Sequence, residues 1–98
     1  HEWKKNHTMI HQTIDLFKAL ANEDRLKIIQ LLLKHDEMYA QDVEKNFFLE
    51  QSTTSHHLNT LRRAGITKAR KKGRHMYYSI NTPHFLDMLD QFRNEIQQ

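Results

Sequence analysis

The sequence predicts a mainly α-helical domain of about five helices with one small two-stranded β-hairpin. Two observations lead to this prediction. Apolar residues recur at the three- and four-residue spacing of amphipathic helices over most of the chain. Two short stretches rich in β-branched and aromatic residues, ITKAR and HMYYSI, flank the turn-like segment KKGR. The 98 residues suit a single domain, and at 38% hydrophobic they allow a small core.

The first half of the chain carries the pattern of two helices. An amphipathic helix is expected over residues 10–21. A second helix should run from Glu23 to Lys34, because Asn22 is a good N-cap and acidic residues follow it. The residues predicted to point inward from this second helix are Leu26, Ile29, Leu32 and Leu33.

A short third helix is expected over residues 40–47, followed by a break at 48–51. A fourth helix should start at Ser52, an N-cap residue, and stop at Gly65, which suits the left-handed position after a helix. This fourth helix begins with a run of small or polar residues, QSTTSHH, and its apolar residues lie on one side. His57 is expected to pack beneath it, so the other side is free for a different task.

The last third of the chain changes pattern. Gly73 supplies the turn between the two predicted strands, in which Tyr77 and Tyr78 should face opposite sides. Thr82 is expected to cap a final helix, with Pro83 in its first turn. A sustained apolar stripe follows on this helix, formed by Phe85, Met88, Leu89, Phe92 and Ile96.

The charge is concentrated in one segment. Residues 51–86 contain seven Lys or Arg and no Asp or Glu, whereas the rest of the chain carries eight basic and twelve acidic residues. A cation-rich segment without carboxylates is typical of a protein that contacts phosphates.

A short helix, a tight turn and a second helix with a polar exposed face form a helix-turn-helix, and the basic hairpin after it forms a wing. The major groove of DNA admits one α-helix, and short polar side chains at the start of that helix can reach base edges. The candidates for base contacts are Gln51, Ser52, Thr53, Ser55 and His56. The candidates for phosphate or minor-groove contacts are Arg62, Arg63, Arg70, Lys71, Lys72 and Arg74.

Three segments, LFKALANEDRLKIIQLLL, QSTTSHHLNTLRRAGI and KKGRHMYYSI, together resemble the ArsR/SmtB family of bacterial winged helix-turn-helix regulators. The resemblance covers about residues 14–96. It implies a cytoplasmic homodimer that binds a palindromic operator and usually represses transcription until an inducer arrives. Residues 1–98 would then form one domain, with dimerisation helices at about 7–21 and 82–97, the helix-turn-helix at 39–64 and the wing at 66–80. The implied dimer interface contains Ile10, Ile14, Phe17, Phe85, Met88, Leu89, Phe92 and Ile96.

The chain departs from the family pattern at the metal sites. It has no cysteine, and Tyr39 and Gln41 occupy the two positions of the family's C-x-C pair, so a thiolate site is excluded. On the last helix, the ligand positions fall on Thr82, His84, Glu95 and Gln98, of which two can bind a metal. We therefore expect no cofactor. The alternative is a metal-responsive repressor whose ligands come from His7, His11, His84 and Glu95.

Other classes fit the sequence less well. With only two glycines, the chain has no Gly-rich phosphate loop, and its Ser and His residues form no enclosed site, so it is not expected to be an enzyme. No apolar run is long enough for a membrane span. The remaining alternative is a winged-helix module that binds proteins.

Phe48 stands where the family's turn often has glycine, so a different turn geometry, or an extra residue in the turn, is expected there.

Overall fold

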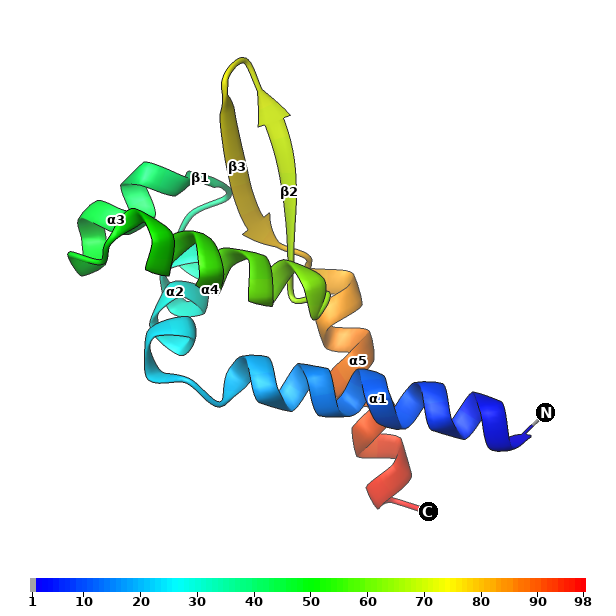
Figure 1. Ribbon diagram of the computed structural model, residues 1–98. Helices are drawn as coiled ribbons and strands as arrows, with labels where there is room; N and C mark the ends of the chain where they lie inside the picture. The colour runs from blue at the N-terminus through cyan, green and yellow to red at the C-terminus, as the bar shows by residue number, and fades with distance from the viewer. Residues whose placement is uncertain (1) are drawn as a thin grey trace.

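The computed structural model describes the backbone of residues 2–98 and the side chains from Met9 onward. Within these residues, five helices and three strands follow one another as in Figure 1. They are α1 (Glu2–Leu20), α2 (Glu23–Lys34), β1 (Met38–Tyr39), α3 (Ala40–Phe47), α4 (Gln51–Arg63), β2 (Thr67–Lys72), β3 (His75–Ile80) and α5 (Thr82–Ile96). The order and types of helices and the wing confirm the predicted winged helix-turn-helix. The first helix also extends further toward the N-terminus than expected.

The sheet has one strand more than the sequence predicted. The strand order is β1-β3-β2, and both pairings are antiparallel. The short strand β1 pairs Met38 with Tyr78 and Tyr39 with Tyr77, which joins the base of the wing to the start of α3. A strand of two residues is too short to show any periodicity, so only its tertiary pairing reveals it. Beyond this base, the hairpin projects from the body of the protein (Figure 1).

The core lies where α1, α2, α3 and α4 meet the base of the sheet. Its fully buried centre includes Leu16, Ile28, Leu32, Val43, Leu58, Leu61 and Ile66. Two inward assignments on α2 are wrong, because Leu26 is 45% exposed and Leu33 is 62% exposed. These residues are seven apart and share a face of the helix, whereas the core is contacted by the adjacent face that carries Ile28, Ile29 and Leu32.

Two predicted helix starts are displaced by a residue or two. Asn22 caps α2 as expected, with its Oδ1 accepting from the backbone N–H of Arg25 at 3.0 Å. In α4, however, Glu50 is the N-cap and Ser52 lies inside the helix, and in α5 the cap is Asn81 instead of Thr82. Neither side chain makes a capping hydrogen bond. A capping preference of about 1 kcal/mol is small enough for tertiary packing to override it.

The end of α4 confirms the prediction at Gly65. This glycine has φ +84°, and its N–H donates to the Arg62 carbonyl at 3.0 Å while the Ile66 N–H donates to the Leu61 carbonyl at 3.1 Å. These two bonds form a Schellman motif, which ends the helix and turns the chain directly into β2. The angle between the fourth helix and the wing therefore depends on this residue.

The turn between α3 and α4 does not follow the prediction. Phe48 adopts the left-handed conformation, with φ 54° and ψ 32°, and its side chain is 95% exposed. The sequence predicted that a phenylalanine here would change the turn geometry, and this prediction is wrong. Phe48 adopts the left-handed conformation that glycine would favour. A left-handed residue with a Cβ costs roughly 1–2 kcal/mol, and burial of the ring within this chain does not offset it.

Candidate nucleic-acid interface

Helix α4 separates a buried face from an exposed one. Leu58 and Leu61 are fully buried, and Thr54 and His57 lie on the same face. The predicted base-contacting residues lie on the other face or at its edge. Gln51, Ser52, Ser55 and His56 are exposed, and Thr53 is half-buried. The structure thus brings these side chains together on one surface and confirms that His57 packs under the helix.

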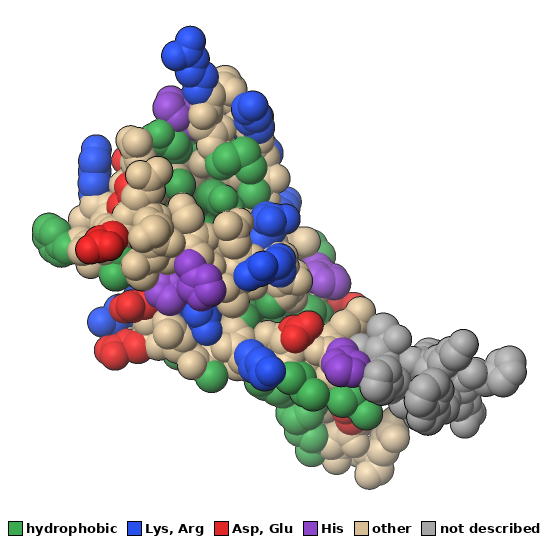
Figure 2. Space-filling view, viewed as in Figure 1, with side chains coloured by type: hydrophobic (Ala, Val, Ile, Leu, Met, Phe, Trp, Pro, Cys, Tyr) green, Lys and Arg blue, Asp and Glu red, His purple; other side chains and the backbone are tan. Residues whose placement is uncertain are grey.

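The predicted phosphate-contacting residues lie at the two ends of this surface. Arg62 and Arg63 are exposed in the last turn of α4, and the wing tip carries exposed Lys71, Lys72 and Arg74. Figure 2 shows basic side chains at the wing tip, along the wing and near α4 on one face of the molecule. The ammonium of Lys72 also lies 5.9 Å from the centre of the Tyr77 ring.

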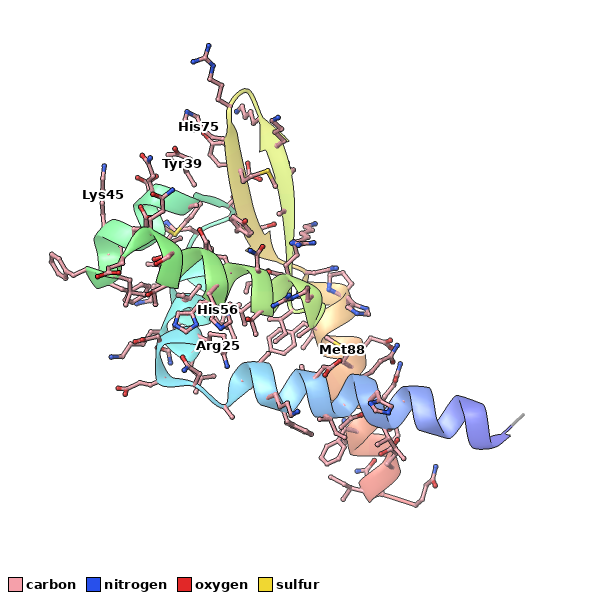
Figure 3. All side chains as sticks on the ribbon, viewed as in Figure 1. Arg25, Tyr39, Lys45, His56, His75 and Met88 are labelled. Atoms are coloured by element: carbon pink, nitrogen blue, oxygen red, sulfur yellow. The ribbon has the colours of Figure 1, made fainter. Side chains whose placement is uncertain are left out.

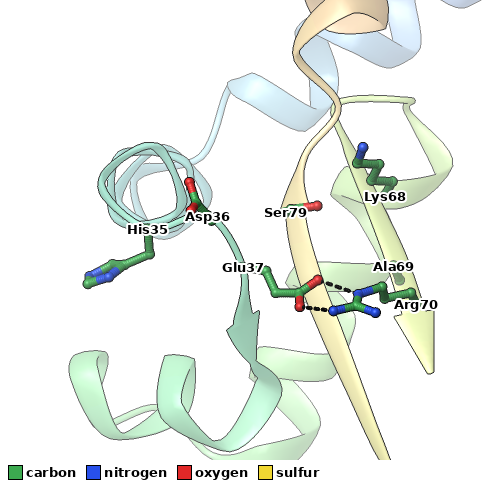
Figure 4. A pocket seen from close by; sticks show the side chains of 7 residues that line it. All are labelled: His35, Asp36, Glu37, Lys68, Ala69, Arg70 and Ser79. Carbon is green, nitrogen blue, oxygen red and sulfur yellow. Dashed lines mark hydrogen bonds and ion pairs between the residues drawn. The ribbon is translucent and has the colours of Figure 1, made fainter. Parts of the chain in front are cut away.

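Arg70 differs from the other cations on the wing. Its Nε and Nη2 donate to the two carboxylate oxygens of Glu37, at 2.7 and 2.5 Å (Figure 4). This hydrogen bonding lowers the pKa of Glu37 below its ordinary value and raises that of Arg70. Arg70 therefore ties β2 to the residue before β1, and a phosphate contact would compete with this bond.

An aromatic cluster supports the wing on its other strand. The Tyr39 ring lies 4.2 Å from the His75 ring and 5.8 Å from the Tyr77 ring, measured between centroids (Figure 3). Tyr77 is half-buried in this cluster, while Tyr78 is buried in the core, so the two tyrosines alternate as predicted. The cluster holds the hairpin at a defined orientation relative to α3.

A network that no sequence pattern indicated joins α1, α2 and α4. Arg25 donates from Nε to the Ala19 carbonyl at 2.7 Å and from Nη2 to the Lys18 carbonyl at 3.1 Å. Its Nη1 lies 3.2 Å from Nδ1 of His57. Because a guanidinium has no acceptor, Nδ1 accepts this bond and the proton of neutral His57 sits on Nε2, which faces the Asp24 carboxylate at 3.9 Å.

Burial, followed by the positive charge of Arg25, lowers the pKa of His57, and the Asp24 carboxylate opposes this only in part. The contact with Arg25 requires a neutral His57 ring. By contacting both His57 and the carbonyls at the end of α1, the guanidinium fixes the C-terminal end of α1 against the inner face of α4. No motif could have indicated the contact, because Arg25 and His57 are 32 residues apart and meet only in the folded chain.

The first and last helices cross (Figure 1), and both expose apolar side chains. The rings of Phe17 and Phe92 pack edge to face, 4.9 Å apart between centroids. Around them, residues predicted for the dimer interface remain exposed in a single chain: Ile10, Ile14, Phe17, Leu89 and Ile96. Leu86, which the prediction omitted, is 54% exposed on α5. Phe85 and Met88 instead pack partly on the core.

The candidate metal ligands that the structure describes, His11, His84 and Glu95, do not come together in a single chain. The side chain of His7 lies outside the described residues, His11 is exposed on α1, and Glu95 is exposed near the end of α5. His84 packs against the end of α4, where a Cβ on Gly65 would lie 2.6 Å from its Nε2. Among the side chains from Met9 onward, no group of three or more potential ligands could hold a metal. None of the helices described is long and apolar enough to cross a membrane.

Comparison with known proteins identifies relatives of this fold and sequence. Residues 22–68 match the family described as bacterial regulatory protein, arsR family. The transcriptional repressor SdpR of Bacillus subtilis (strain 168) is 36% identical over 84 residues, which cover 86% of this chain and 92% of that protein. The cadmium resistance transcriptional regulatory protein CadC of Listeria innocua is 35% identical over 83 residues, covering 82% of this chain and 70% of that protein.

Solved structures agree. The homodimeric winged helix-turn-helix DNA-binding domain of a possible ArsR-family transcriptional regulator from Mycobacterium bovis superposes with a TM-score of 0.77 at 27% identity. The match covers 93% of this chain and 85% of that one.

Proposed function

This chain belongs to the ArsR family of DNA-binding transcriptional regulators, and we propose that it acts as a homodimeric repressor of a palindromic operator. The family and fold are those of regulators and not of enzymes. One observation carries the proposal. The helix α4 buries Leu58 and Leu61 while it exposes the hydrogen-bonding side chains of Gln51, Ser52 and Ser55 beside a basic wing. Repression is supported by the relative SdpR, which is named a transcriptional repressor.

The dimer is supported by the exposed apolar side chains of α1 and α5. Ile14 is 42% exposed and Ile96 is 68% exposed on two helices that pack on each other. A second copy of this surface would bury them, as the homodimeric relative from Mycobacterium bovis suggests. The two α4 helices would then enter successive major grooves, roughly 34 Å apart, which requires an operator with two inverted half-sites.

Each part of the interface would have its own task. Gln51, Ser52, Ser55 and His56, with Thr53 at the edge, would contact base edges, because they lie in the first turns of α4. Arg62 and Arg63 would contact the phosphate backbone from the end of the helix, and the cations of the wing tip would contact phosphates or the minor groove. Arg70 would contribute least, because its guanidinium is already bound to Glu37.

Regulation would not involve thiolates within these residues, since the chain has no cysteine. CadC is named for cadmium resistance, and in that respect this chain would differ from it. We propose a regulator that needs no metal. Calorimetric titration with Zn²⁺ tests this directly: stoichiometric binding that is lost in His84→Ala would favour the metal-responsive alternative.

The DNA-binding experiment is selection of sequences from random duplexes, followed by gel-shift titration at two salt concentrations. An inverted repeat should be enriched. Gln51→Ala should relax base preference in each half-site, by about 1–3 kcal/mol of discrimination. Lys72→Ala should weaken binding to all duplexes about equally and lower the salt slope by about 1 for each protomer. If no sequence is enriched, the chain is not a sequence-specific regulator.

The oligomeric state is tested by sedimentation. Ile14→Glu should yield a folded monomer, because this side chain is exposed in the single chain and its replacement leaves the core intact. Leu33→Glu is the matched control, since Leu33 is equally apolar and 62% exposed, but lies on α2. It should remain dimeric. A dimer that tolerates Ile14→Glu would place the interface elsewhere.

A further inference from the structure

A groove separates the outer edge of α4 from the C-terminal half of α1 and the start of α2. We call it the α1–α4 groove; its cavity has a volume of about 400 Å³. The polar and charged residues that line it are Asp15, Lys18, Arg25, His56, Thr60 and Arg63. Figure 3 shows His56 and Arg25 close together on the side of α4 that faces α1 and α2. His56 therefore belongs both to the predicted base-contacting surface of α4 and to this groove.

The charges of the groove are unequal and mostly unpaired. Its lining contains three cations and a single carboxylate, that of Asp15. The guanidinium of Arg25 is held by the Lys18 and Ala19 carbonyls, so it lies at a fixed position in the wall. Among the described side chains, Lys18 and Arg63 are exposed and form no hydrogen bond or ion pair. Two free cations thus flank the cavity, Lys18 on α1 and Arg63 on α4.

The groove lies where a DNA strand would pass. His56, Thr60 and Arg63 follow one another at four- and three-residue intervals, so they form one edge of α4. When a recognition helix lies in the major groove, its edges face the two sugar-phosphate backbones that border that groove. The strand facing this edge would run between α4 and α1. A phosphate there would meet cations from both walls, with Thr60 and His56 as further hydrogen-bond donors.

We propose that the α1–α4 groove binds a phosphate of the DNA backbone, which makes Lys18 of the dimerisation helix part of the DNA interface. This inference rests on the proposed function. The sequence did not indicate Lys18, because it lies outside the cation-rich segment 51–86 and resembles any outward-facing lysine on an amphipathic helix. Since α1 would also contact the second copy, a shift of the dimer helices would move Lys18 relative to the phosphate.

Gel-shift titration of the full chain on its selected operator tests the proposal, with Lys18→Gln and Asp15→Asn as variants. Lys18→Gln should lower the salt slope by about 0.9 for each protomer. Between 50 and 200 mM salt, the unaltered chain should therefore lose roughly threefold more affinity for each protomer than the variant does. Asp15→Asn should strengthen binding, because it removes the one carboxylate that repels a phosphate in this groove.

The matched control is Lys27→Gln, which removes the same charge from an exposed lysine of α2 that does not line the groove. It should leave affinity and slope unchanged. Equal slopes for Lys18→Gln and the unaltered chain, or weaker binding by Asp15→Asn, would overturn the inference while leaving operator binding intact. If the unaltered chain binds no duplex, both proposals fail. Titration with inorganic phosphate, followed by NMR chemical shifts at Lys18 and Arg63, distinguishes a DNA phosphate from a free anion as the ligand of the groove. If phosphate saturates the groove and the chain binds no duplex, the groove is a site for a small anion.

Discussion

Replacement of Gly65 by alanine should measure how the recognition helix is joined to the wing. The φ of +84° makes any residue with a Cβ unfavourable, by roughly 1–2 kcal/mol. The new Cβ would also lie 2.6 Å from Nε2 and 2.7 Å from Cδ2 of His84. The imidazole must move away, which costs about 1 kcal/mol if it leaves its preferred rotamer. Alanine recovers about 0.5 kcal/mol by restricting the unfolded chain.

The net expectation for Gly65→Ala is a loss of about 2 kcal/mol in the free energy of unfolding, or roughly 8–16 °C in Tm for a domain of this size. Urea denaturation followed by circular dichroism measures it. The protein concentration must be the same for every variant, because the stability of a dimer depends on concentration.

Two controls separate the causes. Gly73→Ala places a Cβ at φ +63° with no heavy atom within 4 Å, so it should show the backbone penalty alone. In a His84→Ala background, Gly65→Ala should lose about 1 kcal/mol less than in the unaltered chain. If Gly65→Ala is no worse than Gly73→Ala and shows no coupling with His84, the packing of the imidazole on the helix end is refuted. If both glycine variants are neutral, the backbone argument fails.

Three further predictions follow from single residues. Phe48→Asn should raise the free energy of unfolding by up to about 1 kcal/mol in urea melts, because asparagine tolerates the left-handed turn and the exposed ring contributes no burial; a loss would mean that the ring stabilises the turn. Thr54→Val should stabilise by about 1 kcal/mol, since Oγ1 is buried without a hydrogen-bond partner in the described chain, and an unchanged Tm would argue against that. His57 should make stability pH-dependent: its pKa is lowered in the folded state, so the unfolded chain binds the proton more readily. The free energy of unfolding should then fall as the pH drops below about 6.5, by at most about 1.4 kcal/mol per pH unit, and His57→Gln should show a shallower fall than the unaltered chain.

The recognition helix shows how far local pattern reaches. Its C-terminal end and its buried face were predicted correctly, because the stop at Gly65 and the apolar spacing of Leu58 and Leu61 are local signals. Its start was wrong, since Glu50 caps it through the backbone alone and no side-chain signal marks that position. The conformation of Phe48 also differs from the prediction. Its residue type disfavours the left-handed conformation, yet packing of the helices on either side imposes it.

The sequence by itself determined the helical and strand periodicities, the polar face of α4 and the presence of one basic segment, residues 51–86, that contains no Asp or Glu. These features depend only on the type and spacing of residues that are close together in the sequence. Only the tertiary structure decided that Arg25 contacts His57, that Arg70 is occupied by Glu37, and that Lys18 shares a groove with Arg63. Such partnerships join residues more than thirty positions apart, and they arise from the packing of whole elements, which no local pattern encodes.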